Sequence, residues 1–309
     1  MQTLVVGAGA VGGYFGGRML AAGRNVTFLV REKRATLLAK NGLQIKSPAG
    51  DLTLANPPTV LKENLTQHYD LIVLSCKAYD LADAIESFAA AVGPQTVILP
   101  LLNGMQHLDI LSQRFGAEKI LGGQCVIAST IDADGAIKHL NTFHGMTFGE
   151  RDGTSSPRVA QIEKEITGAG FDVNVSPSIL QSMWEKWIML ASLAGSTSLM
   201  RSTVGDILQA PGGEQFITAL LEENAAIATA NGHAPSGSFY DRTRKMLTEA
   251  GSTLTASMFR DISNNARIEA DHIIGDLLRR GREAKTKTDL LQVVYIHLKT
   301  YEARSRREA

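Results

Sequence analysis

The segment Met1–Glu32 reads MQTLVVGAGAVGGYFGGRMLAAGRNVTFLVRE and joins a short apolar run to a cluster of glycines. The run at 4–6 predicts a strand, and the pattern GxGxxG follows it at 7–12. An amphipathic helix and a second strand over 25–30 are expected next. Unpaired N–H groups at the start of such a helix, with the positive end of its dipole, stabilise a pyrophosphate. The segment therefore predicts a βαβ unit that binds a dinucleotide.

Each glycine of the motif has an expected role. Gly7 permits the tight turn, Gly9 lets a phosphate approach the backbone, and Gly12 lets the helix pack on the strand. The expected cofactor-binding positions in this loop are Gly7, Ala8, Gly9, Ala10, Val11 and Gly12. The alternative is a glycine-rich turn that connects a strand to a helix and binds nothing, and the complete βαβ unit argues against it.

Arg31 stands at the end of the second strand, about 20 residues after the glycines, where an NAD-binding site usually has an acidic residue. A guanidinium group cannot accept a hydrogen bond from a ribose hydroxyl, but it pairs well with a 2′-phosphate. We therefore expect NADP(H) as the cofactor. Lys33 and Arg34 add positive potential, and the alternative for the run 31–34 is the solvated first turn of a helix.

The composition favours small-molecule partners in a reducing compartment. The 309 residues contain 31 Lys and Arg against 31 Asp and Glu, without the basic excess typical of a nucleic-acid-binding protein. Two cysteines, Cys76 and Cys125, are too few for a disulfide framework, which favours the cytoplasm. No apolar run reaches the roughly 20 residues of a membrane span. The histidines have no metal-binding spacing, so we expect no metal site.

The order of predicted elements divides the chain near residue 177. Strand-like and helix-like segments alternate before it, which indicates an α/β domain with a mostly parallel, doubly wound, Rossmann-like sheet; helical periodicity dominates after it. We expect a cofactor-binding domain over 1–177 and an all-helical domain over 178–309. Strands are expected at 2–6, 25–30, 70–75, 96–100, 120–130, 135–140, 144–149 and 171–175, with a small hairpin between 43 and 60. Helices of the second domain are expected near 178–201, 214–231, 236–250, 252–262, 266–280 and 288–303, before a frayed charged end.

Two polar positions follow predicted strands of the first domain, where open α/β sheets bind ligands. Lys77 follows the apolar run 71–74, where an ammonium group can meet a substrate carboxylate or a nicotinamide ribose. Asn103 follows the run 97–102, and Gly104 permits backbone conformations closed to other residues. A surface lysine at a helix start and an ordinary Asn-Gly turn are the alternatives, and the sequence leaves them open.

Lys186 lies in the strongly apolar segment WEKWIML at 184–190. Desolvation there lowers the pKa of a lysine, which then donates a proton near neutral pH. The alternative, which composition alone favours, is a stem packed on the tryptophans with the ammonium group in water. Ser257 and Glu269 stand on either side of a helix break at 263–265, where Glu269 can also serve only as an early acid for a helix dipole.

Together these positions resemble the ketopantoate reductase (2-dehydropantoate 2-reductase) family over essentially the whole chain. The resemblance rests on the order and spacing of the glycine motif, Arg31, Lys77, Asn103, Lys186, Ser257 and Glu269. It implies NADPH in the first domain and a 2-oxo acid as substrate. It also implies Lys186 as general acid, Glu269 as a second catalytic residue, and substrate contacts from Asn103, Ser257 and Lys77. Lys77 and Asn103 are further expected to contact the cofactor.

Two segments of the chain depart from the family. It commonly has asparagines one and two helical turns after the lysine, and this chain has Leu190 and Ala194 there. Neither side chain can hydrogen-bond a hydroxyl or carboxylate group. Arg267-Ile268 also replaces the usual proline-threonine before the glutamate. A wider or more apolar pocket is the expected consequence.

The expected activity is NADPH-dependent reduction of a 2-oxo acid to a 2-hydroxy acid, with ketopantoate to pantoate, a step of pantothenate biosynthesis, as the first candidate. Two alternatives stay open. One is a related reductase of a more apolar 2-oxo acid, favoured by Leu190 and Ala194. The other is an NADP(H)-binding sensor without catalysis. Apolar helix faces in the second domain also permit a homodimer.

Overall fold

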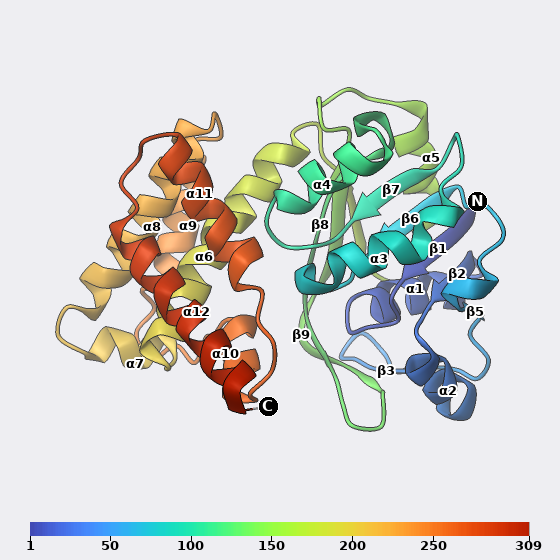
Figure 1. Cartoon of the computed structure of the whole chain (residues 1–309), viewed down its shortest axis with the longest axis horizontal. Coiled ribbons are helices and arrows are strands. Elements are labelled where there is room, and N and C mark those ends of the chain that lie inside the picture. The colour runs from blue at the N-terminus through green and yellow to red at the C-terminus, as the bar shows by residue number, and fades with distance from the viewer. Residues whose placement is uncertain (309) are drawn as a thin grey trace. The chain divides into compact units, whose positions relative to one another are not determined.

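The computed structural model describes residues 1–308, and the chain forms two compact units (Figure 1). Unit 1 consists of Met1–Leu102 and His107–Leu180. Unit 2 consists of Asn103–Gln106 and the chain from Gln181 onward. The segment 103–106 thus belongs with the helical unit, although its neighbours in the chain belong to the unit that contains the sheets.

A parallel five-stranded sheet organises unit 1 and confirms the Rossmann-like fold. Its strand order is β5-β2-β1-β6-β7, and every pair is parallel. The strands are β1 (Gln2–Val6), β2 (Asn25–Leu29), β5 (Thr59–Val60), β6 (Leu71–Leu74) and β7 (Val97–Pro100). The register aligns Thr3 of β1 with Val26 and Leu71. The carboxyl ends of β1 and β6 therefore share one edge, where the glycine loop and the Lys77 segment begin.

The other strands of unit 1 form a second sheet, which was not predicted from the sequence. It has the order β10-β9-β3-β4, with β8 antiparallel to β9. The strands are β3 (Leu43–Lys46), β4 (Leu52–Leu54), β8 (Gly122–Ile131), β9 (Ile137–Gly149) and β10 (Asp172–Val175). The hairpin of β3 and β4 is confirmed, whereas β9 is one strand where two were expected. A short turn joins β8 to β9, and such a turn allows only antiparallel pairing.

Helix α1 lies between the two sheets. The helices of unit 1 are α1 (Gly12–Ala21), α2 (Glu32–Asn41), α3 (Leu81–Phe88), α4 (Gln106–Phe115) and α5 (Pro157–Ile166), with 3₁₀ turns η1 (Lys62–Asn64), η2 (Ala78–Asp80), η3 (Ala89–Ala91) and η4 (Ala117–Lys119). A Cβ added at Gly16 would lie 2.7 Å from Phe28 of β2, and one at Gly17 would lie 2.8 Å from Leu43 of β3. The helix is therefore buried on two faces rather than simply amphipathic, because a sheet covers each face.

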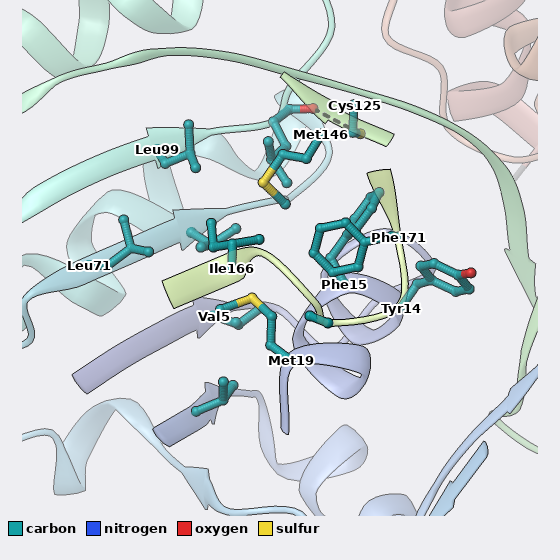
Figure 2. Close-up of a cluster of buried hydrophobic side chains, with 14 of the residues drawn as sticks. Val5, Tyr14, Phe15, Met19, Leu71, Leu99, Cys125, Met146, Ile166 and Phe171 are labelled. Carbon is teal, nitrogen blue, oxygen red and sulfur yellow. Dashed lines mark hydrogen bonds between the residues drawn. The ribbon is translucent and has the colours of Figure 1, made fainter. Parts of the chain in front are cut away.

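The core of unit 1 surrounds this helix (Figure 2). Phe15 of α1 meets Phe171 edge to face, with ring centroids 4.8 Å apart. Val5 of the first sheet and Met146 of the second are both fully buried in the same cluster. Burial of side chains of this size contributes about 1.5–3 kcal/mol each. The core thereby holds the glycine loop at a fixed place between the two sheets.

The regular elements of unit 2 over residues 181–308 are all helices or helical turns, joined by loops. Its elements are α6 (Ile179–Met200), α7 (Val204–Gln209), α8 (Gly213–Ala230), α9 (Gly237–Leu247), α10 (Ser257–Ser263), the π-helical turn η5 (Asp271–Gly275), α11 (Asp276–Glu283) and α12 (Asp289–Glu308). Helix α7 was not predicted; a capping box between Thr203 and Asp206 starts it. A frayed end was expected over 304–309; this was wrong for 304–308, where α12 continues to Glu308, and residue 309 lies outside the described residues.

The start of α12 is fixed by a buried carboxylate of α8. Glu223 is 7% exposed and accepts hydrogen bonds from the N–H groups of Leu290 and Leu291, over 3.2 and 2.8 Å. A carboxylate at a helix N-terminus satisfies unpaired donors and complements the helix dipole. The apolar side chains of Leu291, Val294 and Leu298 on this helix are buried in the same unit.

Candidate active site

The glycine loop between β1 and α1 has the geometry of a phosphate-binding turn. Gly7 has φ +92°, a conformation that favours glycine, and its N–H donates to the carbonyl of Leu29 over 2.9 Å. A Cβ added at Gly9 would meet nothing within 4 Å, so the loop is open there. A Cβ added at Gly12 would lie 2.3 Å from the Gly7 carbonyl oxygen, which agrees with the predicted packing role. An open loop at a helix N-terminus fits the pyrophosphate of a dinucleotide.

Arg31 precedes α2 and is held by two carboxylates of the neighbouring segment. Its Nη2 donates to Oδ2 of Asp83 over 2.7 Å and lies 3.6 Å from Oδ1 of Asp80. The hydrogen bond to Asp83, with the charge of Asp80, raises the pKa of Arg31 above its usual value. The Arg31 side chain is 69% exposed, and exposed ion pairs are weak. A phosphate can therefore compete with these carboxylates for the guanidinium group.

Lys77 follows β6, as the sequence predicted, and immediately precedes the 3₁₀ turn η2. Its backbone is extended, with φ −68° and ψ 145°, and the residue is exposed. The same sheet edge carries the glycine loop, since β1 and β6 are paired in register. Lys77 and the loop thus leave neighbouring strands at their carboxyl ends, where doubly wound sheets bind their ligands.

Lys186 lies in the first half of α6, next to two buried tryptophans. Trp184 is 2% exposed and Trp187 1%, whereas Lys186 is half-buried. Because helical residues turn about 100° per position, Lys186 emerges well away from the face that both tryptophans share. The indole N–H of Trp187 donates to the carbonyl of Ile273 over 2.8 Å. Trp187 thereby joins the helix of Lys186 to the π-helical turn η5.

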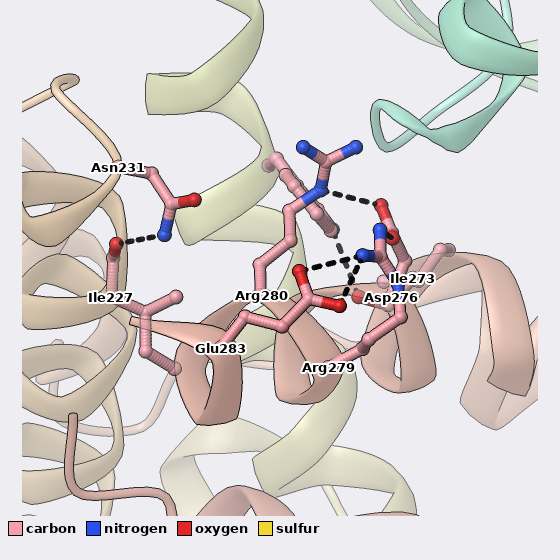
Figure 3. Close-up of polar contacts among 8 residues, drawn as sticks. Ile227, Asn231, Ile273, Asp276, Arg279, Arg280 and Glu283 are labelled. Carbon is pink, nitrogen blue, oxygen red and sulfur yellow. Dashed lines mark hydrogen bonds and ion pairs between the residues drawn. The ribbon is translucent and has the colours of Figure 1, made fainter. Parts of the chain in front are cut away.

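Charged residues of α11 contact this tryptophan pair. Figure 3 shows the ion pairs and hydrogen bonds among Asp276, Arg279, Arg280 and Glu283. The guanidinium carbon of Arg280 lies 5.8 Å from the ring centroids of both Trp184 and Trp187. Its Nε donates to Oδ2 of Asp276 over 3.0 Å, and Arg279 contacts the other oxygen of that carboxylate. The Asp276 side chain is fully buried, so two cations offset the cost of burying its charge. The cluster fixes the position of α6 against α11.

Asn103 and Gly104 pack within unit 2 against His272 of η5. Gly104 has φ +79°, and a Cβ added there would lie 2.9 Å from the His272 carbonyl oxygen. The His272 ring also hydrogen-bonds the backbone of Asn103. His272 is 5% exposed; its burial lowers its pKa, and the charges of Glu269 and Asp276 oppose that shift. His272 was not predicted as a site residue, because a single histidine within an apolar helix does not reveal its contact with Asn103 and Gly104.

Ser257 and Glu269 flank the predicted helix break. Helix α10 begins at Ser257 and ends at Ser263, and Asn265 has φ +52° just after it. Ser257 is exposed and Glu269 is half-buried, immediately before η5. The N–H of Ala256 donates to the hydroxyl of Thr197 on α6 over 3.3 Å, which ties the start of α10 to the helix of Lys186. A π-helical turn beside these residues is noteworthy, because such turns are frequent at functional sites.

The positions that depart from the family leave the Lys186 face of α6 apolar. Leu190 is half-buried and Ala194 is 3% exposed. The nearby serines do not replace the missing amides. Ser192 donates to the carbonyl of Ile188 over 2.9 Å, and Ser196 donates to that of Ser192 over 2.7 Å. Both hydroxyls thus donate within their own helix, and that of Ser192 also accepts from Nδ2 of Asn224 on α8 over 3.0 Å.

Within each unit the structure therefore assembles part of the predicted site. Unit 1 contains the glycine loop, Arg31 and Lys77 along one sheet edge, and unit 2 connects the elements of Asn103, Lys186 and Glu269 through η5. Across residues 1–308 no group of three or more His, Cys, Asp or Glu side chains could hold a metal ion. No helix described in that range is long and apolar enough to cross a membrane.

Two family models together match most of the chain. The ketopantoate reductase PanE/ApbA model matches residues 3–153, and the model of its C-terminal domain matches residues 178–302. The chain belongs to the ketopantoate reductase family. It is accordingly an oxidoreductase that acts on CH–OH groups, and reductases of this family use a nicotinamide cofactor.

Similar curated proteins cover nearly the full length. An "Uncharacterized oxidoreductase YkpB" of Bacillus subtilis (strain 168) is 34% identical over 303 residues, covering 98% of this chain and 99% of that protein. A 2-dehydropantoate 2-reductase of Halobacterium salinarum is 26% identical over 288 residues, covering 92% of this chain and 93% of that protein. Both domains of this family member are thus present in one chain.

Solved structures show the same fold. The 2-dehydropantoate 2-reductase of Geobacter metallireducens has a TM-score of 0.88 at 25% identity, covering 97% of this chain and 99% of that one. A D-mandelate dehydrogenase solved with NADH and anilino(oxo)acetate has a TM-score of 0.87 at 20% identity, with 99% and 100% covered. A dimeric ketopantoate reductase from Staphylococcus aureus has a TM-score of 0.81 at 21% identity, with 99% and 100% covered.

Proposed function

We propose that this protein reduces a 2-oxo acid to a 2-hydroxy acid with NADPH, and that ketopantoate is its first candidate substrate. The observation that carries the proposal is a half-buried lysine, Lys186, on a helix fixed by buried tryptophans, and we take it as the counterpart of the family's general acid. The match of both family models to this chain supports it. The proposal extends the family membership to a reaction and a substrate class.

The chain's own residues divide the work of this reaction. The cofactor, when bound, supplies a hydride to the substrate carbonyl carbon. Lys186 donates a proton from Nζ to the carbonyl oxygen, and Glu269 orients Lys186 or holds a substrate hydroxyl. Ser257 binds the substrate carboxylate, while Asn103 and Lys77 fix the substrate and the nicotinamide ribose.

NADPH is the proposed cofactor because Arg31 lies at the end of β2 and is exposed to a ligand. The positions that would hold the pyrophosphate are Gly7, Ala8, Gly9, Ala10, Val11 and Gly12. Their open loop at the start of α1 suits an anion. The charge of Arg31 favours the 2′-phosphate over the bare ribose hydroxyl.

The test is the oxidation of NADPH, followed by absorbance, in the presence of a set of 2-oxo acids. Turnover with ketopantoate supports the proposal, and the reduced product is identified as pantoate. Binding of NADPH without turnover of any 2-oxo acid or aldehyde would refute it and favour an NADP(H)-binding sensor. Retained turnover in a Lys186→Ala variant would remove the proposed role of that lysine.

A more apolar 2-oxo acid is the second candidate, and Leu190 and Ala194 are the observation that favours it. Apolar side chains stabilise an apolar substrate and offer no hydrogen bond to hydroxyl groups. The fold itself also occurs in the D-mandelate dehydrogenase solved with anilino(oxo)acetate. A comparison of kcat/KM decides: a preference for ketopantoate by orders of magnitude would end this candidate.

We also propose a homodimer in the cytoplasm. Val293 and Ile296 expose 52% and 55% of their surface on α12, and apolar residues of this kind suit a protein interface. The dimeric reductase of Staphylococcus aureus is a related precedent. Two cysteines, Cys76 and Cys125, are too few for a disulfide framework, which suits a reducing compartment. Light scattering after size exclusion tests the dimer, and a monomer mass at micromolar concentration would contradict it.

A further inference from the structure

We propose that Arg34 and Ser129 are positioning residues for the cofactor. They hydrogen-bond carbonyl groups of the glycine loop and thereby orient the N–H groups of the loop toward the cofactor. The proposal rests on the proposed function, because the loop is taken to bind a dinucleotide. The second sheet of unit 1 takes part in this positioning. Ser129 lies on its strand β8, and Arg34 connects its turn at 132–136 to the loop. Neither residue is expected to touch the reacting atoms.

Arg34 bridges the loop and the turn with two hydrogen bonds. Its Nε donates to the carbonyl of Ala8 over 2.9 Å, and its Nη1 donates to the carbonyl of Gly135 over 2.8 Å. Arg34 is not the solvated residue that its place in the run 31–34 indicated. It is half-buried, and burial lowers the pKa of its guanidinium group below the usual value. A buried charge is costly unless hydrogen bonds stabilise it, and here Nε and Nη1 each donate to a backbone carbonyl.

The turn at 132–136, which Arg34 contacts, is held by further hydrogen bonds. Oδ1 of Asp132 accepts hydrogen bonds from the N–H groups of Asp134 and Ala136, over 3.1 and 2.9 Å. Nδ2 of Asn41, at the end of α2, donates to the carbonyl of Asp134 over 3.1 Å. Gly135 has φ +86°, and a Cβ added there would lie 2.7 Å from Nη1 of Arg34. Glycine is therefore required for the guanidinium group to reach this turn.

Ser129 of β8 holds the loop at a second point. Its hydroxyl donates to the carbonyl of Ala10 over 3.2 Å. In a planar trans peptide the carbonyl of one residue points opposite to the N–H of the next. Anchoring the carbonyls of Ala8 and Ala10 therefore directs the N–H groups of Gly9 and Val11 to the other side. Those N–H groups lie in the loop just before α1, and a helix N-terminus suits a pyrophosphate.

This arrangement makes a specific prediction about cofactor affinity. Both NADPH and NADH contain the pyrophosphate, so loss of loop positioning weakens both by the same factor. A direct contact of Arg34 with the 2′-phosphate would weaken NADPH alone. Nη2 of Arg34 has no hydrogen-bond partner among residues 1–308, so it is the atom that such a contact would use. The comparison of the two nucleotides separates the two roles.

The experiment measures the dissociation constants of NADPH and NADH by nucleotide fluorescence in three variants. Arg34→Met keeps the length of the side chain without its donors and should weaken both nucleotides about 10-fold, as expected for loss of a charged hydrogen bond. Arg34→Lys keeps the charge but cannot bridge two carbonyls, so its affinities should also fall. Ser129→Ala should weaken both by a smaller factor. The kcat at saturating cofactor should stay near that of the unmodified protein.

Arg24→Met is the matched control. Arg24 is another half-buried arginine of unit 1, and its Nη2 donates to the carbonyl of Thr167 over 3.0 Å, away from the glycine loop. Its substitution should lower thermal stability without changing either dissociation constant. Hydrogen exchange of the peptide covering residues 7–13 gives a second readout that needs no ligand. Exchange there should be faster in Arg34→Met than in Arg24→Met.

Three results would overturn the proposal. They are unchanged affinities in Arg34→Met with unchanged exchange of the loop, a loss confined to NADPH, or full restoration by Arg34→Lys, which would show that charge alone matters. Failure of the proposed function is distinguishable, since it would appear as absent 2-oxo acid reduction in the unmodified protein with nucleotide binding intact.

Discussion

Arg31→Ala should weaken NADPH binding and leave NADH binding nearly unchanged. A charge-assisted hydrogen bond to the 2′-phosphate contributes about 1.5–3 kcal/mol. Binding must first displace Asp83, whose exposed ion pair with Arg31 over 2.7 Å is typical of pairs that contribute about 0.2–1 kcal/mol. The difference is about 0.5–2.8 kcal/mol, or roughly 2- to 100-fold in the dissociation constant of NADPH.

The competition with Asp83 predicts an opposite effect from the partner residue. Asp83→Asn releases Arg31 and should tighten NADPH binding by up to about 5-fold, with NADH unchanged. Glu86→Gln is the matched control, because Glu86 lies one turn further along α3 and pairs with Arg114 over 3.7 Å instead. Fluorescence titration at several salt concentrations measures all three variants. Equal losses of NADPH and NADH in Arg31→Ala would refute the reasoning, as would an equal gain from Glu86→Gln.

Three other predictions concern unit 2. Lys186→Ala should lower kcat by about 10²–10⁴-fold with NADPH affinity nearly unchanged, and Lys186→Arg should rescue it poorly because a guanidinium group gives up its proton with difficulty; near-normal kcat in a folded alanine variant would contradict the role. Trp187→Phe leaves the carbonyl of Ile273 without its indole donor and should cost about 1–3 kcal/mol in urea unfolding. Burial lowers the pKa of His272, so the unfolded chain takes up a proton first on acidification. The contribution of His272 to stability is then complete above about pH 6.5 and is lost as the pH falls below it, so His272→Gln should reduce the loss of stability on acidification below about pH 6.5, as followed by thermal unfolding.

Local signals were sufficient for much of the fold. The alternation of apolar residues and glycines gave β1, the glycine loop and β2 at their observed places, and helical periodicity gave α6, α8 and α12. The left-handed Asn265 lies at the predicted helix break. These features depend on neighbours in the sequence, since turns, caps and apolar periods are encoded within a few residues.

Long-range partners were the part that the sequence did not predict. The pattern of β9 does not reveal that it pairs with β3, so the second sheet and the burial of both faces of α1 went unforeseen. Arg34 reads as a solvated helix residue because its acceptors, Ala8 and Gly135, are 26 and 101 positions away. His272 meets Asn103 and Gly104 across a similarly long separation. Periodicity reports which face is apolar, not which element covers it.

The kinetics of NADPH oxidation with ketopantoate and with apolar 2-oxo acids of matched size test the central claim most directly. We predict NADPH-dependent turnover of at least one 2-oxo acid, with a 2-hydroxy acid as product, and loss of that turnover in Lys186→Ala. The apolar face formed by Leu190 and Ala194 predicts that apolar substrates are accepted at least as well as ketopantoate. Tight NADPH binding without oxidation by any 2-oxo acid in the series would contradict the account.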